Sequence, residues 1–488
     1  MRDFLKLLVI LLLLFYNMFG DYMKLDSVNY ESINFKDIKK IYMIGIGGVS
    51  MSGIALILQK WGYEVLGSDL ANTLLRSKGI LVNEKQVAEN ITSDIDLIVY
   101  TAAISEDNPE LVEAKKQNIP LMERGEFLGI ITGMYENTIG IAGTHGKTTT
   151  TSMISCIFLE ANLDPTIQVG SYLSNISGNY RIGHSENFIL ESCEYKDSFL
   201  YFKEKSGVVL NIDTDHLDYF KNLDNIKSSF YKYVSGLDEN GFLIYNADDE
   251  NSKELVNHTK AKGVSFGILN DAVFMADKIN YDDEGYASFE LLYNNKFLAN
   301  ISLSVPGKQN VYDALAAIAL SYSYNIKIND IVKGLKNYHG AARRLEFKGY
   351  FKGAKVYDDY GHHPTEVKAV AKAVRNKKYN KSFVVFEPHT YSRVINHKSE
   401  FAESLKNFDQ IITTDIYAAR EKNVNNVTSK DIVIELEKLG KCALYISNYD
   451  DIIDYLKENV EKDDIIVTLG AGNVTKLSDL LTQKRVSW

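Results

Sequence analysis

An apolar run that breaks into glycines, and then into a lysine and four threonines, constrains this chain more than any other feature. Residues 139–151 read IGIAGTHGKTTTT, and a helix-like segment, SMISCIFLEAN, follows them. A strand, a glycine-bearing turn and a helix in this order point consecutive backbone N–H groups into one concavity, where the helix N-terminus adds partial positive charge. That concavity suits phosphate, so the segment predicts a nucleoside triphosphate site.

The side chains at the end of this turn support the same prediction. Lys147 is placed to reach the outer phosphates as a point charge, and Thr148 offers a hydroxyl to the magnesium ion that bridges them. The strict pattern G-x-x-x-x-G-K-[ST] requires glycine where this chain has Ile141. The alternative is an ordinary glycine-rich turn between a strand and a helix.

Length and composition bound the remaining possibilities. A chain of 488 residues is too long for one core and suggests about three domains. The net charge of −10 argues against a nucleic-acid-binding surface, which would carry a basic excess. The three cysteines, Cys156, Cys193 and Cys442, form no C-x-x-C pair, so neither a disulfide framework nor a thiolate zinc site is indicated. A reducing cytoplasm fits this composition.

The N-terminus departs from that picture. Residues 7–19, LLVILLLLFYNMF, follow Arg2 and Lys6 and resemble a signal-peptide core or a membrane anchor. The run is shorter than the roughly 20 residues that span a bilayer, and export would separate the body from ATP. No A-x-A-like cleavage site follows, and Met23 stands just beyond. We therefore interpret residues 1–22 as an upstream extension of a cytoplasmic enzyme, which argues against membrane association.

A second glycine turn opens the body of the chain. From Lys39 the sequence KKIYMIGIGGVSMSGIALILQKWGYEVLGSD predicts a strand, a turn, an amphipathic helix and a second strand that ends at Asp69. Gly45 and Gly47 fill the first two positions of G-x-G-x-x-G, but Ser50 takes the third. A dinucleotide, another nucleotide such as UDP, and a purely structural turn all remain possible interpretations.

The rest of the chain alternates strand and helix patterns. Strands are expected at 94–105, 187–192, 207–212, 241–246, 381–388, 409–417 and 463–470, a hairpin at 287–305 and a packed helix at 310–324. This alternation predicts an α/β architecture. We place the domain boundaries at 23–135, 136–338 and 339–488.

Polar residues follow the expected strands of the middle domain. Glu191 and Glu194 stand at one strand end, and His216 follows the end of the next. Strand ends near a phosphate-binding turn line the site in an open parallel sheet, and carboxylate oxygens suit magnesium. Glu191 is therefore a candidate metal ligand and His216 a candidate metal or substrate contact. The alternative is a salt-bridged carboxylate and a loop histidine.

The third domain supplies further candidates in HGAARRLEF, VYDDYGHHPTEV, FEPHTYSR and DIYAARE. Arg344 is suited to stabilise transferring phosphate charge, and Arg393 to hold a carboxylate bidentately. Tyr360 and the histidines of these segments could fix polar substrate groups. Taken singly, each segment could also be a surface turn.

Together these segments resemble the Mur ligase family. The matching segments are GIGGVSMSGIA, GTHGKTTTT, ESCEYKDSFL, NIDTDHLDYF, PGKQNVYDALAA, RRLEF, YDDYGHHPTE, EPHTYSR, DIYAARE and LGAGN, which run in order from about residue 42 to the end of the chain. Within the family, the likeness is greatest to the members that join L-alanine to UDP-N-acetylmuramate.

The resemblance implies a fold and a reaction. The fold is α/β with three domains: a Rossmann-like UDP-binding domain, a central P-loop ATPase domain with a mainly parallel sheet, and a C-terminal Rossmann-like domain that binds the amino acid. The reaction is the ATP-dependent ligation of L-alanine to the lactyl carboxylate of UDP-N-acetylmuramate through an acyl phosphate, in peptidoglycan precursor synthesis. Two Mg²⁺ ions are implied, and we expect a monomer or homodimer.

The resemblance also implies roles for individual residues. It assigns ATP binding to Gly143, Thr144, His145, Gly146, Lys147, Thr148, Thr149 and Asn310, and the UDP pyrophosphate to Gly45, Gly47 and Gly48. The implied magnesium ligands are Thr148, Glu191 and His216, the catalytic set is Lys147, Glu191, His216, Arg344 and Asp359, and alanine is held by Tyr360, His389 and Arg393.

Two segments depart from the family pattern. Gln309 and Asp313 replace a histidine and an asparagine that the family commonly shows, which bears on adenine recognition. Cys193 and Tyr195 replace an aspartate and a serine common in some members. Neither change removes a phosphate or metal group.

Three other functions compete with the first. A recycling ligase that attaches a whole peptide to UDP-N-acetylmuramate would share the ATP and UDP sites. A nicotinamide-dependent oxidoreductase would explain the first glycine turn but leaves Lys147 and the third domain unexplained. A non-catalytic sensor of UDP-muramate would not need the set of Lys147, Glu191 and Arg344.

Overall fold

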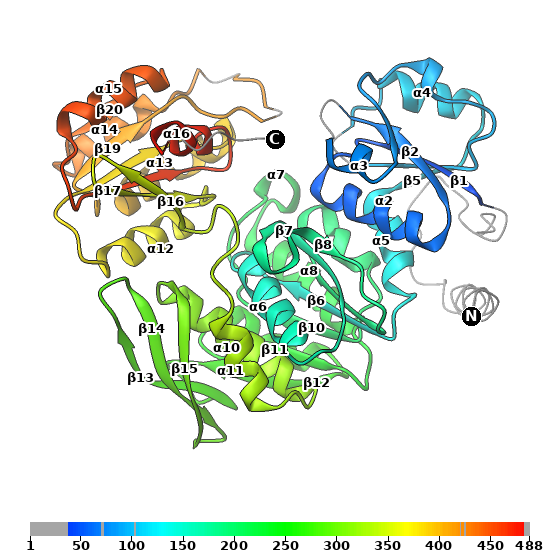
Figure 1. Cartoon of the computed structure of the whole chain (residues 1–488), viewed down its shortest axis with the longest axis horizontal. Helices are drawn as coiled ribbons and strands as arrows, with labels where there is room; N and C mark the ends of the chain where they lie inside the picture. The colour runs from blue at the N-terminus through cyan, green and yellow to red at the C-terminus, as the bar shows by residue number, and fades with distance from the viewer. Residues whose placement is uncertain (1–37, 70–72, 102–103, 420, 424–425, 483–488) are drawn as a thin grey trace.

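Three β-sheets with flanking helices follow one another along the part of the chain that the structure describes (Figure 1). The computed structural model describes residues 38–69, 73–101, 104–419, 421–423 and 426–482. The expected extension over residues 1–22 lies outside these residues. Within them, no helix has both the length and the apolar character that crossing a membrane requires.

The first sheet has the strand order β3-β2-β1-β4-β5, and all of its pairs are parallel. Its strands are β1 (Lys40–Ile44), β2 (Glu64–Ser68), β3 (Leu81–Asn83), β4 (Leu97–Tyr100) and β5 (Leu121–Glu123). The helices are α2 (Val49–Trp61), α3 (Thr73–Ser77), α4 (Pro109–Lys116) and α5 (Arg124–Thr132), with a 3₁₀ turn η3 (Ala88–Asn90). The order reverses between β1 and β4, so the turn after β1 lies where open α/β sheets bind ligands.

The middle sheet has the order β15-β14-β13-β12-β11-β10-β6-β9-β7-β8. Its strands are β6 (Asn137–Ala142), β7 (Thr166–Leu173), β8 (Gly178–Arg181), β9 (Asn187–Glu191), β10 (Ser206–Val209), β11 (Phe242–Asn246), β12 (Lys262–Gly267), β13 (Phe274–Tyr281), β14 (Tyr286–Tyr293) and β15 (Lys296–Pro306). The pairs from β13 through β7 are parallel, whereas β8, β14 and β15 pair antiparallel at the two ends.

Helices and short turns connect these middle strands. They are α6 (Lys147–Glu160), α7 (Leu217–Phe220), α8 (Leu223–Ser235), α9 (Glu250–Glu254), α10 (Gln309–Ser323) and α11 (Ile328–Lys336), with the 3₁₀ segments η4 (Ser174–Ile176), η5 (Tyr195–Tyr201) and η6 (Leu255–His258). The central position of β6 places the turn before α6 in the middle of the sheet's carboxyl edge.

The third sheet has the order β16-β17-β21-β18-β19-β20, in which only the β16–β17 pair is antiparallel. Its strands are β16 (Glu346–Phe351), β17 (Ala354–Asp359), β18 (Ser382–Phe386), β19 (Gln410–Thr413), β20 (Ala443–Tyr445) and β21 (Ile465–Leu469). The helices are α12 (Pro364–Arg375), α13 (Tyr391–Leu405), α14 (Lys430–Lys438), α15 (Tyr449–Asn459) and α16 (Thr475–Leu481).

These elements confirm the α/β prediction and refine it. The hairpin forms around Asn294 and Asn295, which both take left-handed backbone angles of 49° and 61°. The helix expected from Ser152 begins five residues earlier at Lys147, because Gly146 turns the chain directly into the first helical residue. The edge strand β8 carries the polar sequence GNYR, which has no strand pattern to detect. Each predicted domain range contains one sheet, and the boundaries themselves stay a prediction.

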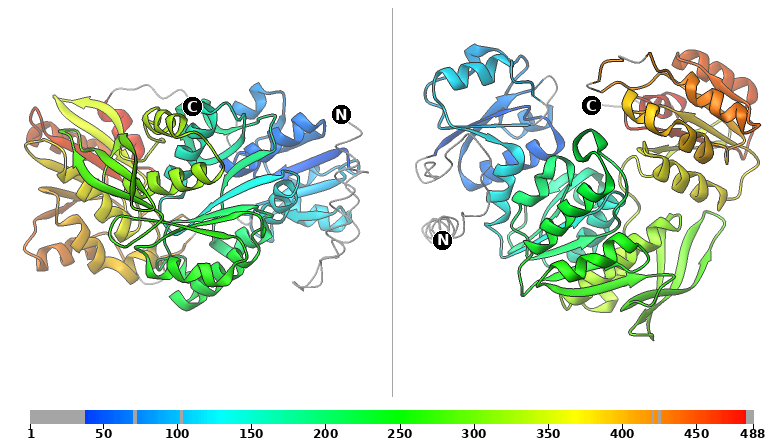
Figure 2. Two further views of the ribbon diagram at one scale, coloured as in Figure 1. Left: turned by 90° about the horizontal axis from the view of Figure 1, so that it is seen from below. Right: turned by 180° about the vertical axis from the view of Figure 1, so that it is seen from behind.

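The three units meet at two different seams (Figure 2). Met51 and Phe127 of the first unit share one buried apolar cluster with Phe188 and Phe199 of the middle unit. The middle and third units instead meet through polar contacts, such as the 2.5 Å bond from Lys355 Nζ to Glu284 Oε1. The first seam therefore continues a hydrophobic core, whereas the second is charged.

Candidate active site

The turn between β6 and α6 has the geometry that phosphate binding needs. Gly143 and Gly146 adopt φ angles of 131° and 90°, which side-chain-bearing residues rarely adopt. Asn211 fixes the turn from the next strand loop, because its Oδ1 accepts the His145 N–H at 2.9 Å and its carbonyl accepts the Thr144 N–H at 3.1 Å. The first-turn N–H groups of α6 have no side-chain cap. Uncapped N–H groups at a helix N-terminus suit an anion.

Lys147 lies within this turn and is paired. Its ammonium donates to the carbonyl of Gly143 at 2.5 Å and to Glu194 Oε2 at 3.0 Å. Burial by itself would lower the pKa of Lys147, but the neighbouring Glu194 carboxylate outweighs burial and raises it. The lysine is therefore a fixed positive charge beside the turn.

Thr148, Glu191 and Arg344 come together next to Lys147. The Thr148 hydroxyl donates to Glu191 Oε2 at 3.1 Å, and Arg344 Nη2 donates to Thr148 Oγ1 at 3.3 Å. Arg344 arrives from the third unit, on a turn whose neighbours Arg343 and Leu345 hold left-handed φ angles of 59° and 46°. Such strained residues cluster at functional sites. The arginine thus brings the third unit's charge to the phosphate turn.

His216 lies apart from Glu191 in its contacts. Its ring packs on Tyr195 with centroids 4.7 Å apart, and its Nε2 is 3.9 Å from Asp215 Oδ2. Neither a hydrogen bond nor an ion pair joins His216 to Glu191, both of which the structure describes. Asp215 links His216 and Tyr195 to the third unit, because its Oδ1 accepts a hydrogen bond from Arg393 Nη2 at 2.9 Å.

The three residues expected to hold alanine lie at the second seam. Arg393 Nη1 is 3.1 Å from His389 Nδ1. Burial lowers the pKa of His389 to about 4, so this histidine is neutral near pH 7 and accepts the arginine N–H. Tyr360 lies under the guanidinium groups of Arg343 and Arg344, 4.8 and 5.5 Å from its ring centre.

Asp359 supports the turn that carries Arg344. Its Oδ2 accepts the N–H of Leu345 at 2.7 Å, and its Oδ1 accepts the N–H of Gly361 at 2.7 Å. Burial raises its pKa to about 6, against the opposing charge of Arg344. The carboxylate therefore holds the two chain segments that present Arg344 and Tyr360.

The helix α10 brings a further carboxyl to the phosphate turn. Asp313 is 6% exposed and accepts the Thr150 hydroxyl at 3.2 Å. Burial raises its pKa to about 8. Asn310, one turn earlier, donates to the carbonyl of Pro306 at 2.7 Å. Asp313, which replaces an asparagine that the family commonly shows, thus lies against the phosphate turn.

The first glycine turn is built differently. Gly45 has a φ of 78°, and its N–H donates to the Ser68 carbonyl at 2.9 Å. The Gly47 N–H donates to Asp69 Oδ2 at 3.0 Å, which ties the turn to the end of β2. Gly48 caps α2 without a side-chain bond, which leaves helix N–H groups available. Ser50 contacts Gln168 of the middle unit at 2.6 Å.

Comparisons with known proteins place this geometry in a family. Residues 40–136 match the Mur ligase family, catalytic domain, residues 141–321 the Mur ligase middle domain, and residues 343–472 the Mur ligase, glutamate ligase domain. A UDP-N-acetylmuramate--L-alanine ligase of Caldanaerobacter subterraneus subsp. tengcongensis is 44% identical over 92% of this chain and 98% of its own. The ligase of the same name from Clostridium kluyveri is 45% identical over 92% and 99%. The chain belongs to the Mur ligase family.

Solved structures of Mur ligases share the fold. The UDP-N-acetylmuramate-alanine ligase of Thermotoga maritima superposes with a TM-score of 0.78 at 26% identity, covering 91% of this chain and 98% of that one. A murein peptide ligase from Psychrobacter arcticus gives 0.69 at 21% identity, covering 92% and 100%. The second likeness, at that identity, concerns the fold alone.

The structure brings two carboxylates to His145, those of Asp213 and Glu366, which the sequence did not single out. His145 Nε2 lies 3.5 Å from Asp213 Oδ2, and His145 Nδ1 lies 3.4 Å from Glu366 Oε1. Burial would lower the pKa of His145, but the two carboxylates outweigh it and raise the pKa to about 9. A sequence signal existed for Glu366, because His363, Pro364 and Glu366 have the spacing of a helix capping box.

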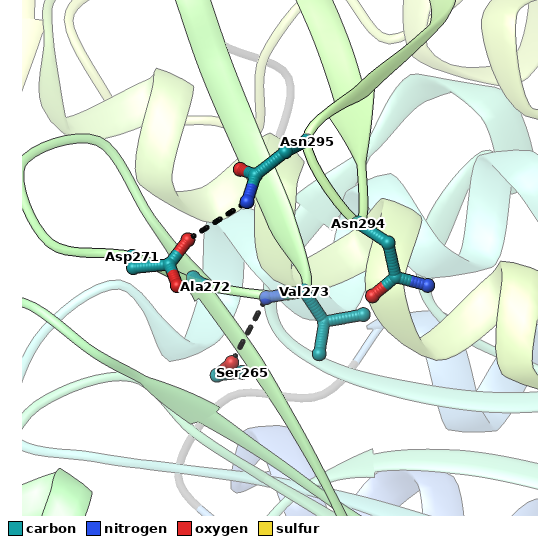
Figure 3. Close-up of a pocket in the computed structure, with 6 residues that line it drawn as sticks. All are labelled: Ser265, Asp271, Ala272, Val273, Asn294 and Asn295. Atoms are coloured by element: carbon teal, nitrogen blue, oxygen red, sulfur yellow. Dashed lines mark hydrogen bonds between the residues drawn. The ribbon is translucent and has the colours of Figure 1, made fainter.

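A separate hollow lies at the turns before β13 and after β14 (Figure 3). Asn295 Nδ2 donates to Asp271 Oδ1 at 3.3 Å there, and the Val273 N–H donates to Ser265 Oγ at 3.0 Å. It is lined by Ser265, Asp271, Ala272, Val273, Asn294 and Asn295. None of the predicted site residues lies among them, so we assign it no role in the reaction.

Proposed function

We propose that this Mur ligase joins L-alanine to the lactyl carboxylate of UDP-N-acetylmuramate at the expense of ATP. The observation that carries the proposal is the 44% identity, over 92% of this chain, to a UDP-N-acetylmuramate--L-alanine ligase. The phosphate turn supports an ATP-dependent reaction. So do the charged side chains beside it: Lys147 is bonded to Glu194, and Glu191 and Arg344 are both bonded to Thr148.

The first chemical step makes the carboxylate reactive. A lactyl carboxylate oxygen attacks the γ-phosphorus of ATP, the bond to the β-phosphate oxygen breaks, and ADP leaves an acyl phosphate. In our proposal Lys147 exchanges its Gly143 carbonyl contact for phosphate oxygens and holds their charge. Arg344, beside Thr148, faces the transferring phosphoryl group. Fixed charges of this kind supply most of the stabilisation in phosphoryl transfer.

The Thr148 hydroxyl and the Glu191 carboxylate fit a magnesium ion. They are hard oxygen donors 3.1 Å apart at the N-terminus of α6. When bound, Mg²⁺ neutralises phosphate charge that develops in the transfer. We propose this pair for one ion and Glu191 with His216 for a second, as the family resemblance implies.

The second step forms the amide. The alanine amine attacks the acyl carbonyl, a tetrahedral intermediate forms, and inorganic phosphate leaves. We propose that Arg393 holds the alanine carboxylate, since its guanidinium already pairs with the Asp215 carboxylate at 2.9 Å. The neutral His389 at 3.1 Å then orients the arginine without competing for the anion. Tyr360 lines the same seam.

The first glycine turn is proposed to bind the UDP pyrophosphate. The available N–H groups at the start of α2 and the flexible Gly45, Gly47 and Gly48 support close approach of phosphate. The seam between the first and middle units would then bring the muramate toward the phosphate turn.

Phosphate release tests this function. The purified protein receives ATP, Mg²⁺ and UDP-N-acetylmuramate with L-alanine, with a tripeptide, or with no acceptor. We expect release that depends on alanine, with the UDP-sugar-alanine amide identified by mass spectrometry. Release that depends on the tripeptide would instead make the protein a recycling ligase, and no release with any acceptor would favour a sensor.

Two further properties belong to the proposal. We place the reaction in the cytoplasm, where ATP is available to it. A monomer or homodimer stays a prediction, which light scattering on the purified protein measures directly.

A further inference from the structure

Three side chains whose atoms could bind one metal ion meet at the second seam, and no step of the proposed reaction uses these side chains. They are His145 in the phosphate turn, Asp213 in the loop after β10 and His363 at the start of α12, and we call them the seam cluster. One ring nitrogen of each histidine and one carboxylate oxygen of Asp213 lie within 4.8 Å of one another. Two structural units thus supply one set of ligand atoms.

The spacing within the seam cluster suits a shared ion better than direct hydrogen bonds. His145 Nε2 and Asp213 Oδ2 are 3.5 Å apart, longer than the roughly 2.8 Å of a charge-assisted hydrogen bond. Two ligands about 2.0–2.1 Å from a tetrahedral zinc ion are separated by about 3.3 Å. This pair is therefore close to the separation of two ligands on one ion.

The histidines of the seam cluster are also incompletely hydrogen-bonded, although both ring nitrogens of His145 face carboxylates at 3.4–3.5 Å. His363 is only 5% exposed, and its Nε2 makes no hydrogen bond. Both ring nitrogens of His145 are buried without one as well. These are three of the six buried side-chain N and O atoms without a partner in the described part of the chain. A buried polar atom left unpaired costs about 1–3 kcal/mol, so the unpaired Nε2 of His363 beside the loosely paired ring of His145 points to a ligand between them.

Neighbouring groups orient the seam cluster as the surroundings of a metal site do. Glu366 Oε1 faces Nδ1 of His145 at 3.4 Å, the arrangement in which a carboxylate aligns a metal-bound histidine. The Thr365 hydroxyl donates to Asp213 Oδ2 at 3.0 Å. Coordination by His363 would cost one weak contact, the 3.4 Å bond from Thr365 N to its Nδ1. Either the ion takes Nδ1, or it takes Nε2 and the ring proton moves to Nδ1.

We propose that the seam cluster binds a transition-metal dication of the zinc class and so ties the phosphate turn to the third unit. Two imidazoles and a carboxylate favour Zn²⁺, Ni²⁺ or Co²⁺ over Mg²⁺, which prefers oxygen ligands. The Asp213 side chain is 41% exposed, which gives an ion a route in. The proposal does not rest on the proposed function, because it concerns binding only.

The test is zinc binding by the full chain, measured by competition with a chromophoric chelator in excess Mg²⁺. Cobalt is the second probe, because a tetrahedral site gives it intense visible absorption. The test variants are His363→Asn, which keeps a side chain able to cap α12, and Asp213→Asn. His216→Asn is the matched control, since it removes an imidazole from the proposed magnesium site instead.

We expect one zinc ion per chain, bound at least about 10- to 100-fold more weakly in His363→Asn and Asp213→Asn, with the cobalt absorption lost. His216→Asn should bind zinc as the wild type does. Circular dichroism checks that each variant is folded. Zinc binding by folded His363→Asn equal to that of the wild type would overturn the proposal, as would a loss confined to His216→Asn.

Discussion

The two glycine turns of this Mur ligase share a backbone plan and differ in what surrounds it. Each follows an inner strand of the parallel part of its sheet and opens a long helix. The first is closed by Asp69 on the Gly47 N–H and packs at an apolar seam. The second carries Lys147 and Thr148 and meets Glu191, Glu194 and Arg344.

The different surroundings suit the first turn to bind a phosphate group and the second to take part in its transfer. A turn that offers backbone N–H groups can hold a pyrophosphate that does not react. Transferring a phosphoryl group needs compensating charges and metal ligands as well, and the second turn gathers from two units of the fold the side chains that we propose for these roles. Substitutions that distinguish the two turns test this division.

The largest effect is expected from Lys147→Ala in the second turn. Loss of the lysine ammonium beside the phosphate turn should lower the rate of alanine-dependent phosphate release by about 10² to 10³ or more. The control is Lys60→Ala, an exposed lysine at the end of the helix after the first turn. Near-full activity of Lys147→Ala would contradict the proposed role of the Lys147 ammonium in phosphoryl transfer.

A glycine-to-alanine substitution should lower the free energy of unfolding when it is made in the second turn but not when it is made in the first. In Gly146→Ala the new Cβ would lie 2.6 Å from Asp313 Oδ1, at a φ of 90°, so we expect a loss of about 1–3 kcal/mol in the free energy of unfolding. Gly48→Ala places its Cβ no closer than 3.5 Å to any neighbour and should unfold like the wild type. Chemical denaturation of both variants makes the comparison, and equal stabilities would contradict it.

Asp313 should make the second turn sensitive to pH. Burial raises its pKa from 3.8 to about 8, so the folded state keeps a proton that the unfolded state releases. The wild type should therefore lose stability relative to Asp313→Asn as pH rises from about 4 to about 8. Since each pKa unit is worth about 1.4 kcal/mol, the difference should reach several kcal/mol at pH 8. Unfolding of both proteins at pH 5 and pH 8 measures it, and a difference that does not change with pH would refute the assignment.

The smallest effect is expected in the first turn. Asp69→Asn keeps an acceptor for the Gly47 N–H but loses the charge that strengthens the bond. A net hydrogen bond is worth about 0.5–1.5 kcal/mol, so KM for UDP-N-acetylmuramate should rise about 2- to 10-fold. KM for alanine should not change. A fall in kcat comparable to that of Lys147→Ala would show that the first turn takes part in the chemistry.

Local patterns predicted much of the fold. The strand at 187–191 and the hairpin about Asn294 were visible as apolar runs and alternations. The helix at 309–323 was visible from its small and apolar periodicity. The strand β8 was missed because an edge strand need not be apolar. The sequence also named Lys147 and Thr148 from their spacing, but their ties to Glu194 and Arg344 depend on how distant segments pack.

The contacts of the second seam show where sequence reasoning stops. His145, Asp213 and Glu366 each appeared in a segment with recognisable motifs, yet nothing in those motifs brings the three together. Their approach depends on the third unit resting against the middle one. That placement is set by many weak contacts and has no periodicity along the chain.

The sequence by itself determined the α/β class and the two glycine turns, because backbone conformation and helix or strand pattern are local properties, and it predicted which residues bind phosphate. The tertiary structure decided which charges meet: Glu194 on Lys147, Arg344 on Thr148 and Asp313 against Gly146. Electrostatic interactions act through space and strengthen with burial, so they are defined only once the units have packed together.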